Sequence, residues 1–482
     1  MKLGFARKDI TPPAGAPLAG YLKDRVSTGV HDKLYVRALV FTGPGYPPSA
    51  AGGAGAAGGA ASKGGASAPG DVAAAMLQLD LLNLDRLCVE KIRQRAAALG
   101  IGRDRLIMFA AHTHSAFGGI FDMNRGINRE LRPLLGAPDP ALVDLVVSQS
   151  AAALEEALKK PVETTVRIRR GILDGLGTNR RDPALPCDRD LLMCEFYRID
   201  RKKILLYKLS CHPTVLNGDN LLISADFPGA LASRLEDVPD GYDMAVFVNG
   251  AAGDMSTRFT RRESGFAECA RYALLISEAL AALREGVFLP LEKVFLRYHT
   301  IVLRRASPPD PAGAEERLAA AERALEAARE SEAADPSAQA ARTADMERTA
   351  DRADRAAPAV SARIRRAESL VEGARIAAAR ARARKKPKGR GRAEGDEIPV
   401  ETGILGINGE TLVCPPLELF STLALGLREG RERPADVFGY ANDLLGYLPD
   451  RAAHEAGDYE ALFSEFAPGE GERYIEQLAA LL

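Results

Sequence analysis

Apolar residues recur along this chain in two alternating patterns. Short apolar runs bounded by turn-forming residues predict strands at 105–110, 204–211, 244–250 and 410–415. Longer stretches, in which apolar residues repeat every three or four positions, predict helices at 141–160 and 265–286. The alternation predicts an α/β (mixed α+β) fold, with a central twisted mixed sheet flanked by helices.

Two segments lack both patterns. Residues 44–72 are nearly all Gly, Ala, Ser and Pro and cannot bury enough apolar surface to order themselves, so they predict a flexible surface loop between two strands of a hairpin. Residues 306–396 are rich in Ala, Arg and Glu and predict a charged helical insertion, in which a solvated helix and a second helix project from the domain as a hairpin. We therefore treat residues 1–482 as one domain with these two additions.

Each of the four predicted strands runs into a polar loop. His112 and His114 follow the first strand, His212 the second, Ser256 the third and Glu418 the fourth, at the start of a predicted helix. Ligands of open α/β sheets bind outside the carboxyl ends of strands, where such loops converge, so the site is expected there. On an extended backbone, the single residue between His112 and His114 directs both imidazoles to one face.

Two imidazoles and one carboxylate are a ligand set for a catalytic Zn²⁺ that keeps an open position for water or substrate. Two alternatives remain open at this level. His212 could be a buried histidine satisfied by hydrogen bonds, and Glu418 could be a helix N-terminal carboxylate that faces the macrodipole. The recurrence of polar loops after apolar strands favours the metal site.

The overall composition restricts the function classes. Lys and Arg (64) nearly balance Asp and Glu (65), which disfavours a nucleic-acid-binding surface, and the basic stretch near residue 385 is short. No apolar run approaches the length of a signal peptide or a transmembrane span. The six cysteines are scattered without metal-binding spacing, which predicts reduced thiols and a cytoplasmic protein. The sequence predicts no oligomeric state.

Six motifs occur in the order found in one known family. They are "DITPPAGAPLAGY", "AAHTHSAFGG", "SCHPT", "NGAAGDMS", "PPLELFSTLALGL" and "GYANDLLGYLPDRAAHEAGDYE". Through them the chain resembles the catalytic N-terminal domain of the neutral/alkaline (non-lysosomal) ceramidases, as a cytosolic bacterial-type homologue without the C-terminal immunoglobulin-like domain. It departs from the family where Ser256 is followed by Thr257 and Arg258 rather than Pro-Asn.

The resemblance implies a role for each matching residue. The metal ligands it implies for Zn²⁺ are His112, His212, Glu418 and Tyr447. Ser256 matches the serine of the amide-cleaving step, while His114 and Tyr459 match residues that bind substrate or stabilise the transition state. Arg180 matches an arginine of the same pocket, although Arg181 beside it leaves the register open.

The implied function is that of a zinc-dependent amidohydrolase that cleaves an N-acyl, ceramide-like amide bond, with a place in sphingolipid metabolism. Its expected partner is a small-molecule or lipid-like N-acyl substrate, with no nucleic acid and no transmembrane segment. Two alternatives stay open: a metal-dependent hydrolase of another ester or non-lipid amide, and a catalytically silent metal-binding homologue. Whether Ser256 or a metal-bound water is the nucleophile is also left open by the sequence.

Overall fold

The computed structural model describes residues 1–43, 71–125, 128–129, 131–307, 310–334, 362–385, 397–428, 430 and 434–482. The predicted loop at 44–72 lies outside the described residues except for its last two positions, and Val72 already begins a strand. Among the helices in the described ranges, none has both the length and the hydropathy required to span a bilayer.

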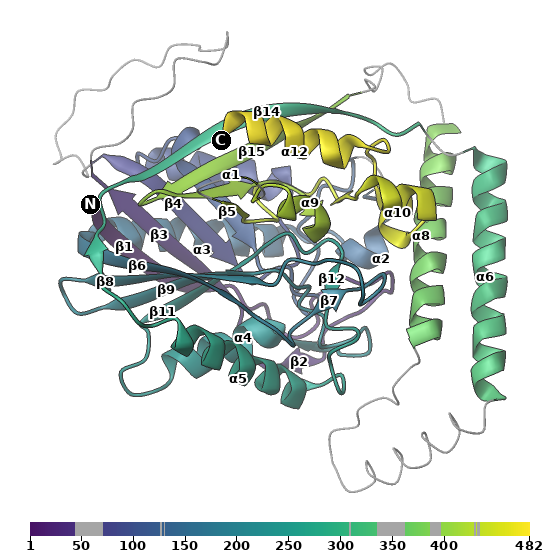
Figure 1. Cartoon of the computed structure of the whole chain (residues 1–482), viewed down its shortest axis with the longest axis horizontal. Helices are drawn as coiled ribbons and strands as arrows, with labels where there is room; N and C mark the ends of the chain where they lie inside the picture. The colour runs from purple at the N-terminus through teal and green to yellow at the C-terminus, as the bar shows by residue number, and fades with distance from the viewer. Residues whose placement is uncertain are drawn as a thin grey trace, which may run out of the picture.

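A nine-stranded mixed sheet forms the centre of the molecule, in the order β11-β9-β8-β6-β1-β3-β4-β5, with β13 also paired to β6 (Figure 1). Its strands are β1 Lys2–Asp9, β3 Tyr35–Thr42, β4 Val72–Leu79, β5 Leu106–Ala110, β6 Val162–Ile172, β8 Asp190–Arg198, β9 Lys203–Leu209, β11 Met244–Asn249 and β13 Leu289–Pro290. The strands predicted at 105–110, 204–211 and 244–250 are confirmed as β5, β9 and β11.

The two halves of this sheet face each other across a shared core. They join where β1 pairs with β6, at Lys2 with Glu163 and Leu3 with Val162. Phe109 of β5 and Val248 of β11 belong to one buried apolar cluster, and β11 contacts β5 although the two strands stand at opposite ends of the strand order. The loops after β5, β9 and β11 therefore meet because the sheet folds back on itself.

A second, four-stranded sheet closes a third side of that core. It has the order β14-β15-β16-β18. Its strands are β14 Val294–Arg304, β15 Glu397–Ile407, β16 Glu410–Cys414 and β18 Ala435–Val437. The strand predicted at 410–415 is confirmed as β16, but in this second sheet rather than beside β5 or β9.

Helices cover the outer faces of the sheets. The two predicted at 141–160 and 265–286 are confirmed as α3 Pro140–Lys159 and α5 Phe266–Ala282. Helices α1 Arg86–Ala98 and α3 pack beside β1, β3 and β5, whereas α4 Asp226–Glu236 packs with α5 and on β11 (Figure 1). Helix α12 Glu470–Leu481 lies against β14.

Short elements shape the loops that follow the strands. They are β2 Gly29–Val30, η1 Arg103–Arg105, α2 Arg132–Leu135, β7 Thr178–Asn179, β10 Leu222–Ile223, β12 Met255–Ser256, β17 Glu418–Leu419, α9 Ser421–Leu425, β19 Tyr447–Leu448, α10 Arg451–Ala456 and α11 Tyr459–Phe463. Three of these strands, β12, β17 and β19, carry residues predicted to be functional.

The described residues of the segment 306–396 form two long helices, α6 Pro311–Ala333 and α8 Ala362–Lys385, which lie side by side (Figure 1). Alanines fill their contact, and ion pairs such as Glu322 with Arg375, at 3.2 Å, join their exposed sides. The expectation of a charged hairpin that projects from the domain does not hold for one side of α8. Val371 is 3 % and Ile376 2 % exposed, and Ile376 belongs to the core cluster that includes α1 and α3.

A buried network of ion pairs connects the two sheets. Lys208 of β9 lies 2.5 Å from Asp188 and 3.5 Å from Asp436 of β18, and all three side chains are fully buried. Arg428 pairs with the same two aspartates, at 2.9 and 2.8 Å, and Arg170 of β6 also pairs with Asp436. We call Lys208, Asp188, Asp436, Arg428 and Arg170 the ion network.

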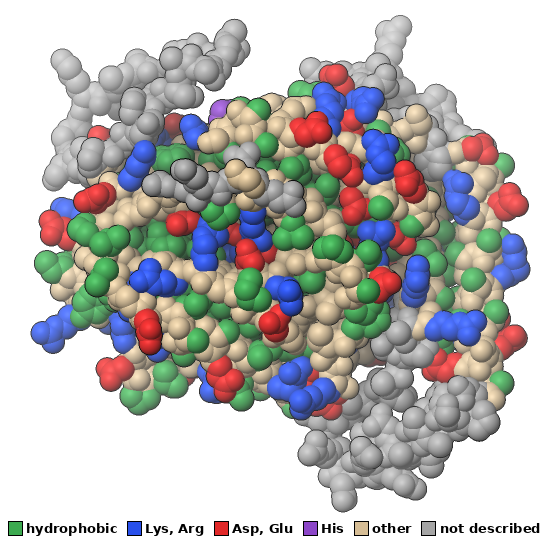
Figure 2. All heavy atoms as spheres, viewed as in Figure 1, with side chains coloured by type: hydrophobic (Ala, Val, Ile, Leu, Met, Phe, Trp, Pro, Cys, Tyr) green, Lys and Arg blue, Asp and Glu red, His purple; other side chains and the backbone are tan. Residues whose placement is uncertain are grey.

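The face seen in Figure 2 carries Lys and Arg interspersed with Asp and Glu. No continuous basic surface crosses the described atoms of that face. This distribution agrees with the nearly balanced composition.

Candidate metal centre

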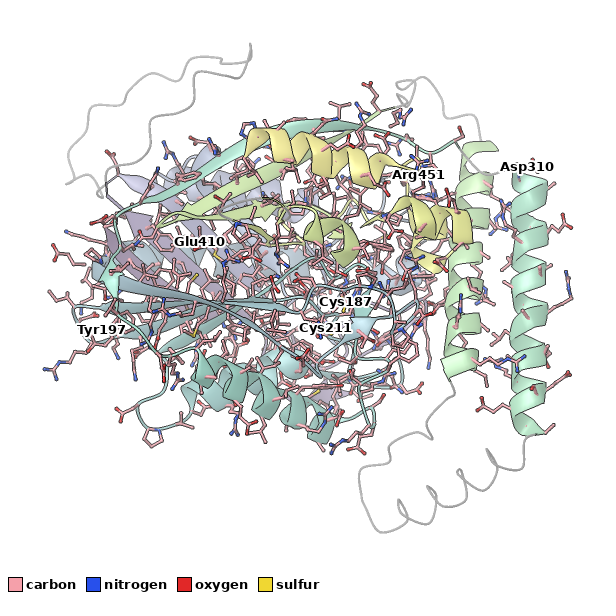
Figure 3. All side chains as sticks on the ribbon, viewed as in Figure 1. Cys187, Tyr197, Cys211, Asp310, Glu410 and Arg451 are labelled. Atoms are coloured by element: carbon pink, nitrogen blue, oxygen red, sulfur yellow. The ribbon has the colours of Figure 1, made fainter. Side chains whose placement is uncertain are left out.

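The two histidines that follow β5 and β9 are anchored through their backbones. His112 has a left-handed conformation (φ 69°), and its N–H donates to Leu81 O at 2.9 Å. The side chain of Asn249 ties both strand exits together, since its Nδ2 donates to Ala111 O and to Cys211 O. Figure 3 labels Cys211, which lies immediately before His212 and near β7 and β12.

Hydrogen bonds fix the tautomers of His112 and His212. His112 Nδ1 lies 2.8 Å from Leu82 O, and His212 Nδ1 lies 2.7 Å from Ala252 O. A carbonyl oxygen only accepts hydrogen bonds, so each Nδ1 must carry a proton. Burial lowers the pKa of His212 to about 4, so its ring is neutral near pH 7 and its Nε2 presents a lone pair.

Glu418 brings a carboxylate to the Nε2 atoms of both histidines. Its Oε2 lies 3.2 Å from His112 Nε2 and 3.2 Å from His212 Nε2. Glu418 lies in the strand β17 rather than at a helix start, so the interpretation of its side chain as a helix N-terminal carboxylate is wrong. Burial would raise the pKa of Glu418, but His112 and His212 lower it well below its ordinary value.

His114 completes what we call the histidine cluster, His112, His114, His212 and Glu418. One ring nitrogen from each histidine lies within 4.8 Å of the others, and the Nε2 atoms of His112 and His114 are 3.4 Å apart. The rings meet edge to face, at 85°. The expectation of an extended backbone here is wrong, because His112 has a positive φ, and the left-handed residue directs the rings together instead.

The environment of His114 is tight. The Tyr21 ring packs edge to face against it, at 5.2 Å between centroids, and a Cβ at Gly20 would lie 2.6 Å from the imidazole. Burial, followed by the neighbouring His112 and His212, lowers the pKa of His114 well below 6.5. Its Nδ1 is buried and has no hydrogen-bond partner among the described residues.

Arg180 and Tyr447 border the cluster. Tyr447 pairs with Glu418 in the parallel ladder of β19 and β17, which places the two side chains on the same side. The Arg180 guanidinium lies over the rings of Tyr447 and Tyr459, at 5.3 and 5.6 Å, and its Nη1 is 3.5 Å from His212 Nε2. Glu460 holds it through an ion pair to Nε at 2.5 Å.

The two neighbouring arginines point to different partners. Arg181 Nε donates to Asp458 at 2.5 Å and its Nη1 reaches Asp450 at 3.5 Å, away from the histidines. Arg180 is thus the arginine that faces the cluster.

Ser256 lies in β12, which pairs with β7, and its backbone forms a bridge with that of His212. Its side chain is 5 % exposed, and its Oγ accepts from the N–H of Arg258 at 3.1 Å. Neighbouring Asp254 has a structural role, since its carboxylate accepts from the N–H of Ser421 at 2.6 Å and from Asn179 at 2.9 Å.

Two residues of the site escaped the sequence reasoning. Tyr440 stacks on His112, at 4.2 Å between ring centroids and 27° between planes, and Asn249 joins the strand exits. Tyr440 is the first tyrosine of "GYANDLLGYLPD", in which the resemblance implied a role only for Tyr447. Asn249 looks like an ordinary strand-end residue. Only their tertiary contacts distinguish them.

The nitrogen and oxygen atoms that converge here fit a divalent cation. Glu418 Oε2 is buried and has no hydrogen-bond donor among the described residues, and His212, whose ring is neutral near pH 7, presents a lone pair on Nε2. Acceptors that converge in this way repel one another unless a cation lies between them. Neutral imidazoles and a carboxylate are ligands that Zn²⁺ accepts.

Comparison with known proteins gives a consistent result for the fold. No protein-family model matches the sequence, and neither does any curated protein. Two solved structures resemble the chain with a TM-score of 0.65 each: neutral ceramidase from Pseudomonas aeruginosa, 17 % identical, and a ceramidase complexed with C2, 16 % identical. The matches cover 99 % of this chain and 73 % and 74 % of those chains. The chain therefore has the fold of neutral ceramidase.

Proposed function

We propose that the protein is a zinc-dependent amidohydrolase of the neutral ceramidase family that cleaves an N-acyl, ceramide-like amide bond. The observation that carries the proposal is the convergence of His112 Nε2, His212 Nε2 and Glu418 Oε2, with both Nδ1 protons held elsewhere. The shared fold of the solved ceramidases supports an amide as the target. The location of this site at the meeting point of several strand-end loops is typical of an enzyme.

His112, His212, Glu418 and Tyr447 would hold the Zn²⁺. The proximity of the first three follows from the 3.2 Å contacts of Glu418 with both imidazoles. Tyr447 joins them because it is paired in register with Glu418. His114, whose Nε2 is 3.4 Å from that of His112, is an alternative ligand if the Tyr447 hydroxyl stays protonated.

When bound, Zn²⁺ would supply a Lewis acid that polarises a carbonyl and acidifies water. The residues around it suit the remaining tasks. Arg180 Nη2 is buried and lacks a hydrogen-bond partner within the described ranges, so it is available to donate to the oxygen on which negative charge develops. Tyr459, whose ring lies beside Tyr447 and under Arg180, would orient the substrate at the same place.

Ser256 and His114 would handle the nucleophile and the proton. The Ser256 Oγ accepts from the backbone, so its own proton remains available for transfer or for orienting a water. Burial keeps His114 neutral near pH 7, and a neutral imidazole accepts a proton. These assignments give Ser256 a role as nucleophile or as the group that positions water.

Metal analysis and a substrate panel test the proposal together. Purified protein should carry about one Zn²⁺ per chain. It should hydrolyse N-acyl amides, including a short-chain ceramide, faster than the matched esters, and treatment with a chelator should abolish the activity until Zn²⁺ is restored. Protein that binds Zn²⁺ but cleaves only the esters would overturn the amidase assignment, and protein without Zn²⁺ affinity would overturn the metal assignment.

A further inference from the structure

Helix α8 packs directly against the loops that form the candidate site. A Cβ at Gly373 would lie 3.2 Å from Tyr459 O and 3.2 Å from the Leu462 side chain, so the absence of a side chain lets the helix approach α11 closely. Farther along the helix, Arg380 Nη1 donates to Ser464 O. Figure 1 shows α8 between α6 and the region of α10. Of the two helices of the insertion, α8 is thus the one that borders the site.

A second contact joins α8 to the loop that carries Ser256. Arg258 Nη2 donates to Ser369 Oγ of α8 at 3.1 Å, and its Nη1 donates to Arg180 O at 3.4 Å. The backbone N–H of the same arginine donates to Ser256 Oγ. Residue 258 is also the position at which the sequence departs from the ceramidase motif. Arg258, which departs from the motif, is therefore also a residue that contacts helix α8.

Glu372 lies between these two contacts. It is three residues after Ser369, so it lies on the same side of the helix as that residue. The charged and aromatic groups that interact with it electrostatically include Arg258, Arg180, Tyr459 and Tyr21. Tyr459 and Tyr21 flank the histidine cluster, one beside Tyr447 and the other against His114. Glu372 is thus close enough to Tyr459 and Tyr21 for its charge to act on both rings.

Most of the positive charge near Glu372 has other partners. Arg180 pairs with Glu460 at 2.5 Å, and Arg375 pairs with Glu322 of α6 at 3.2 Å. Burial, followed by the nearby Glu368, raises the pKa of Glu372 to about 7. A partly desolvated carboxyl group of this kind gains from a hydrogen-bond donor or a cation placed beside it.

We propose that Glu372 is a specificity-determining residue of the substrate cleft, and that it selects amides whose amine half carries an additional hydrogen-bond donor, an ammonium or a hydroxyl group. The proposal rests on the amidase function proposed above and makes it more specific. Helix α8 then forms one wall of the cleft. The scissile amide lies at the histidine cluster, and the donor group of the substrate reaches Glu372.

The matched variants are Glu372→Gln and Glu368→Gln. Glu368 lies one turn earlier on α8 and pairs with Arg329 of α6 at 3.0 Å, so its substitution removes one charge from the same helix that already has a partner within the insertion. Gln keeps the size of the Glu side chain in both variants. Unchanged Zn²⁺ content and melting temperature will show that both variants are folded.

The probes are three compounds with one octanoyl chain and an amine half that ends in an ammonium, a hydroxyl or a methyl group. They are prepared as amides for hydrolysis and as analogues in which CH₂ replaces the amide N–H, for binding by calorimetry to the Zn²⁺-loaded protein. Wild type and Glu368→Gln should bind the ammonium analogue roughly 10- to 100-fold more tightly than the methyl analogue, the factor expected for one hydrogen bond to a charged group. A smaller preference is expected for the hydroxyl analogue. Glu372→Gln should lose both preferences.

Three results would overturn the role of Glu372: equal preferences in Glu372→Gln and wild type, no preference in wild type, or no binding of any analogue. The hydrolysis measurements address the proposed function separately. If the ammonium preference depends on Glu372 but none of the amides is cleaved, the amidase assignment fails and the recognition role of Glu372 stands. If the amides are cleaved without any preference, the amidase assignment stands and the role of Glu372 fails.

Discussion

Two buried polar clusters begin on the same strand and differ in how their charges are balanced. Lys208 belongs to β9, and His212 comes four residues after Lys208, just beyond the end of the strand. In the ion network, Lys208 and Arg428 stand between the carboxylates of Asp188 and Asp436. In the histidine cluster, His112 Nε2, His212 Nε2 and Glu418 Oε2 face one another, and the Arg180 guanidinium, whose Nη1 is 3.5 Å from His212 Nε2, is paired with Glu460. Figure 3 labels a residue beside each cluster, Glu410 near Arg170 and Cys211 next to His212.

The difference distinguishes a structural cluster from a ligand-binding one. Burial by itself would raise the pKa of Asp188, but Lys208 and Arg428 lower it well below 3.8, so the network supplies its own counter-charges. In the histidine cluster, Glu418 Oε2 and His114 Nδ1 are buried without a hydrogen-bond partner among the described residues, so these two atoms lose their hydration without gaining a partner. A buried cluster that the chain completes serves the fold, whereas one left incomplete indicates a bound group.

The largest effect is expected at His212. His212→Ala should reduce bound Zn²⁺ from about one per chain to nearly none, because a three-residue remnant of the ligand set holds the metal poorly. Amide hydrolysis should fall with it, and circular dichroism should remain that of a folded protein. His299→Ala, on β14 in the other sheet, is the control and should keep its metal. Full Zn²⁺ occupancy in His212→Ala would contradict the ligand set.

A substitution in the ion network should lower the stability of the fold and leave metal binding unchanged. Lys208→Met leaves two carboxylates without a fully buried cation, and removal of one partner from such a cluster costs about 3–5 kcal/mol of unfolding free energy. Chemical denaturation measures that loss. The folded variant should still bind one Zn²⁺ in metal analysis. Loss of Zn²⁺ with little change in stability would show that the two clusters are not separate.

Ser256→Ala separates the chemical step from metal binding at the histidine cluster. The variant should retain Zn²⁺ and its melting temperature, and turnover should fall roughly 100-fold or more, as for the loss of a nucleophile or proton-handling group. Steady-state hydrolysis with metal analysis on the same sample is the measurement. Unchanged turnover would leave a water as the nucleophile and would exclude a reaction step at Ser256.

The pH dependence of stability gives a finer test of the ion network. The pKa of Asp188 is lowered in the folded protein, so its unfolded form binds a proton first as the pH falls through about 3.8. The stability from Asp188 is therefore fully present above that pH and is lost below it. The difference in unfolding free energy between wild type and Asp188→Asn should narrow as the pH falls below this value. A constant difference would show that Asp188 does not carry the effect.

The smallest effect is expected at Tyr440. Its hydroxyl group is buried and has no hydrogen-bond partner among the described residues, while its ring stacks on His112. Tyr440→Phe should therefore change the unfolding free energy by about 1 kcal/mol or less and leave Zn²⁺ in place. Tyr440→Ala, which removes the ring, is the comparison and should weaken metal retention. Metal loss in Tyr440→Phe would indicate that the hydroxyl group contacts the bound cation.

Local sequence patterns were sufficient to predict the regular elements. The apolar runs that became β5, β9, β11 and β16 and the periodic stretches that became α3 and α5 were recognisable because side-chain alternation and helical periodicity are short-range properties. The same patterns failed for Glu418. The apolar residues around it predicted a helix, but parallel pairing with Tyr447, far along the chain, holds it in a strand.

Local sequence patterns also failed to predict the buried side of helix α8. Its Ala- and Arg-rich composition predicted a helix of a projecting charged hairpin, yet Ile376 is buried in a core built from α1, α3 and the first half of the sheet. The few apolar residues of the helix gave too weak a pattern to predict a buried face. The small side chains, among them Gly373, allow the close approach to α11, which depends on a partner 80 or more residues away in the sequence.

The sequence by itself determined the residue types of the site and the loops that carry them. His112, His114, His212, Ser256 and Glu418 each follow a recognisable element, because strands and their exits are encoded locally. Tertiary structure decided that these loops meet, since β5 and β11 come together only when the two halves of the sheet fold over one core. It also decided the protonation pattern, because the carbonyls of Leu82 and Ala252 that hold the Nδ1 protons come from other segments of the chain. Long-range packing thus turned a set of polar strand ends into a cluster of acceptors suited to a cation.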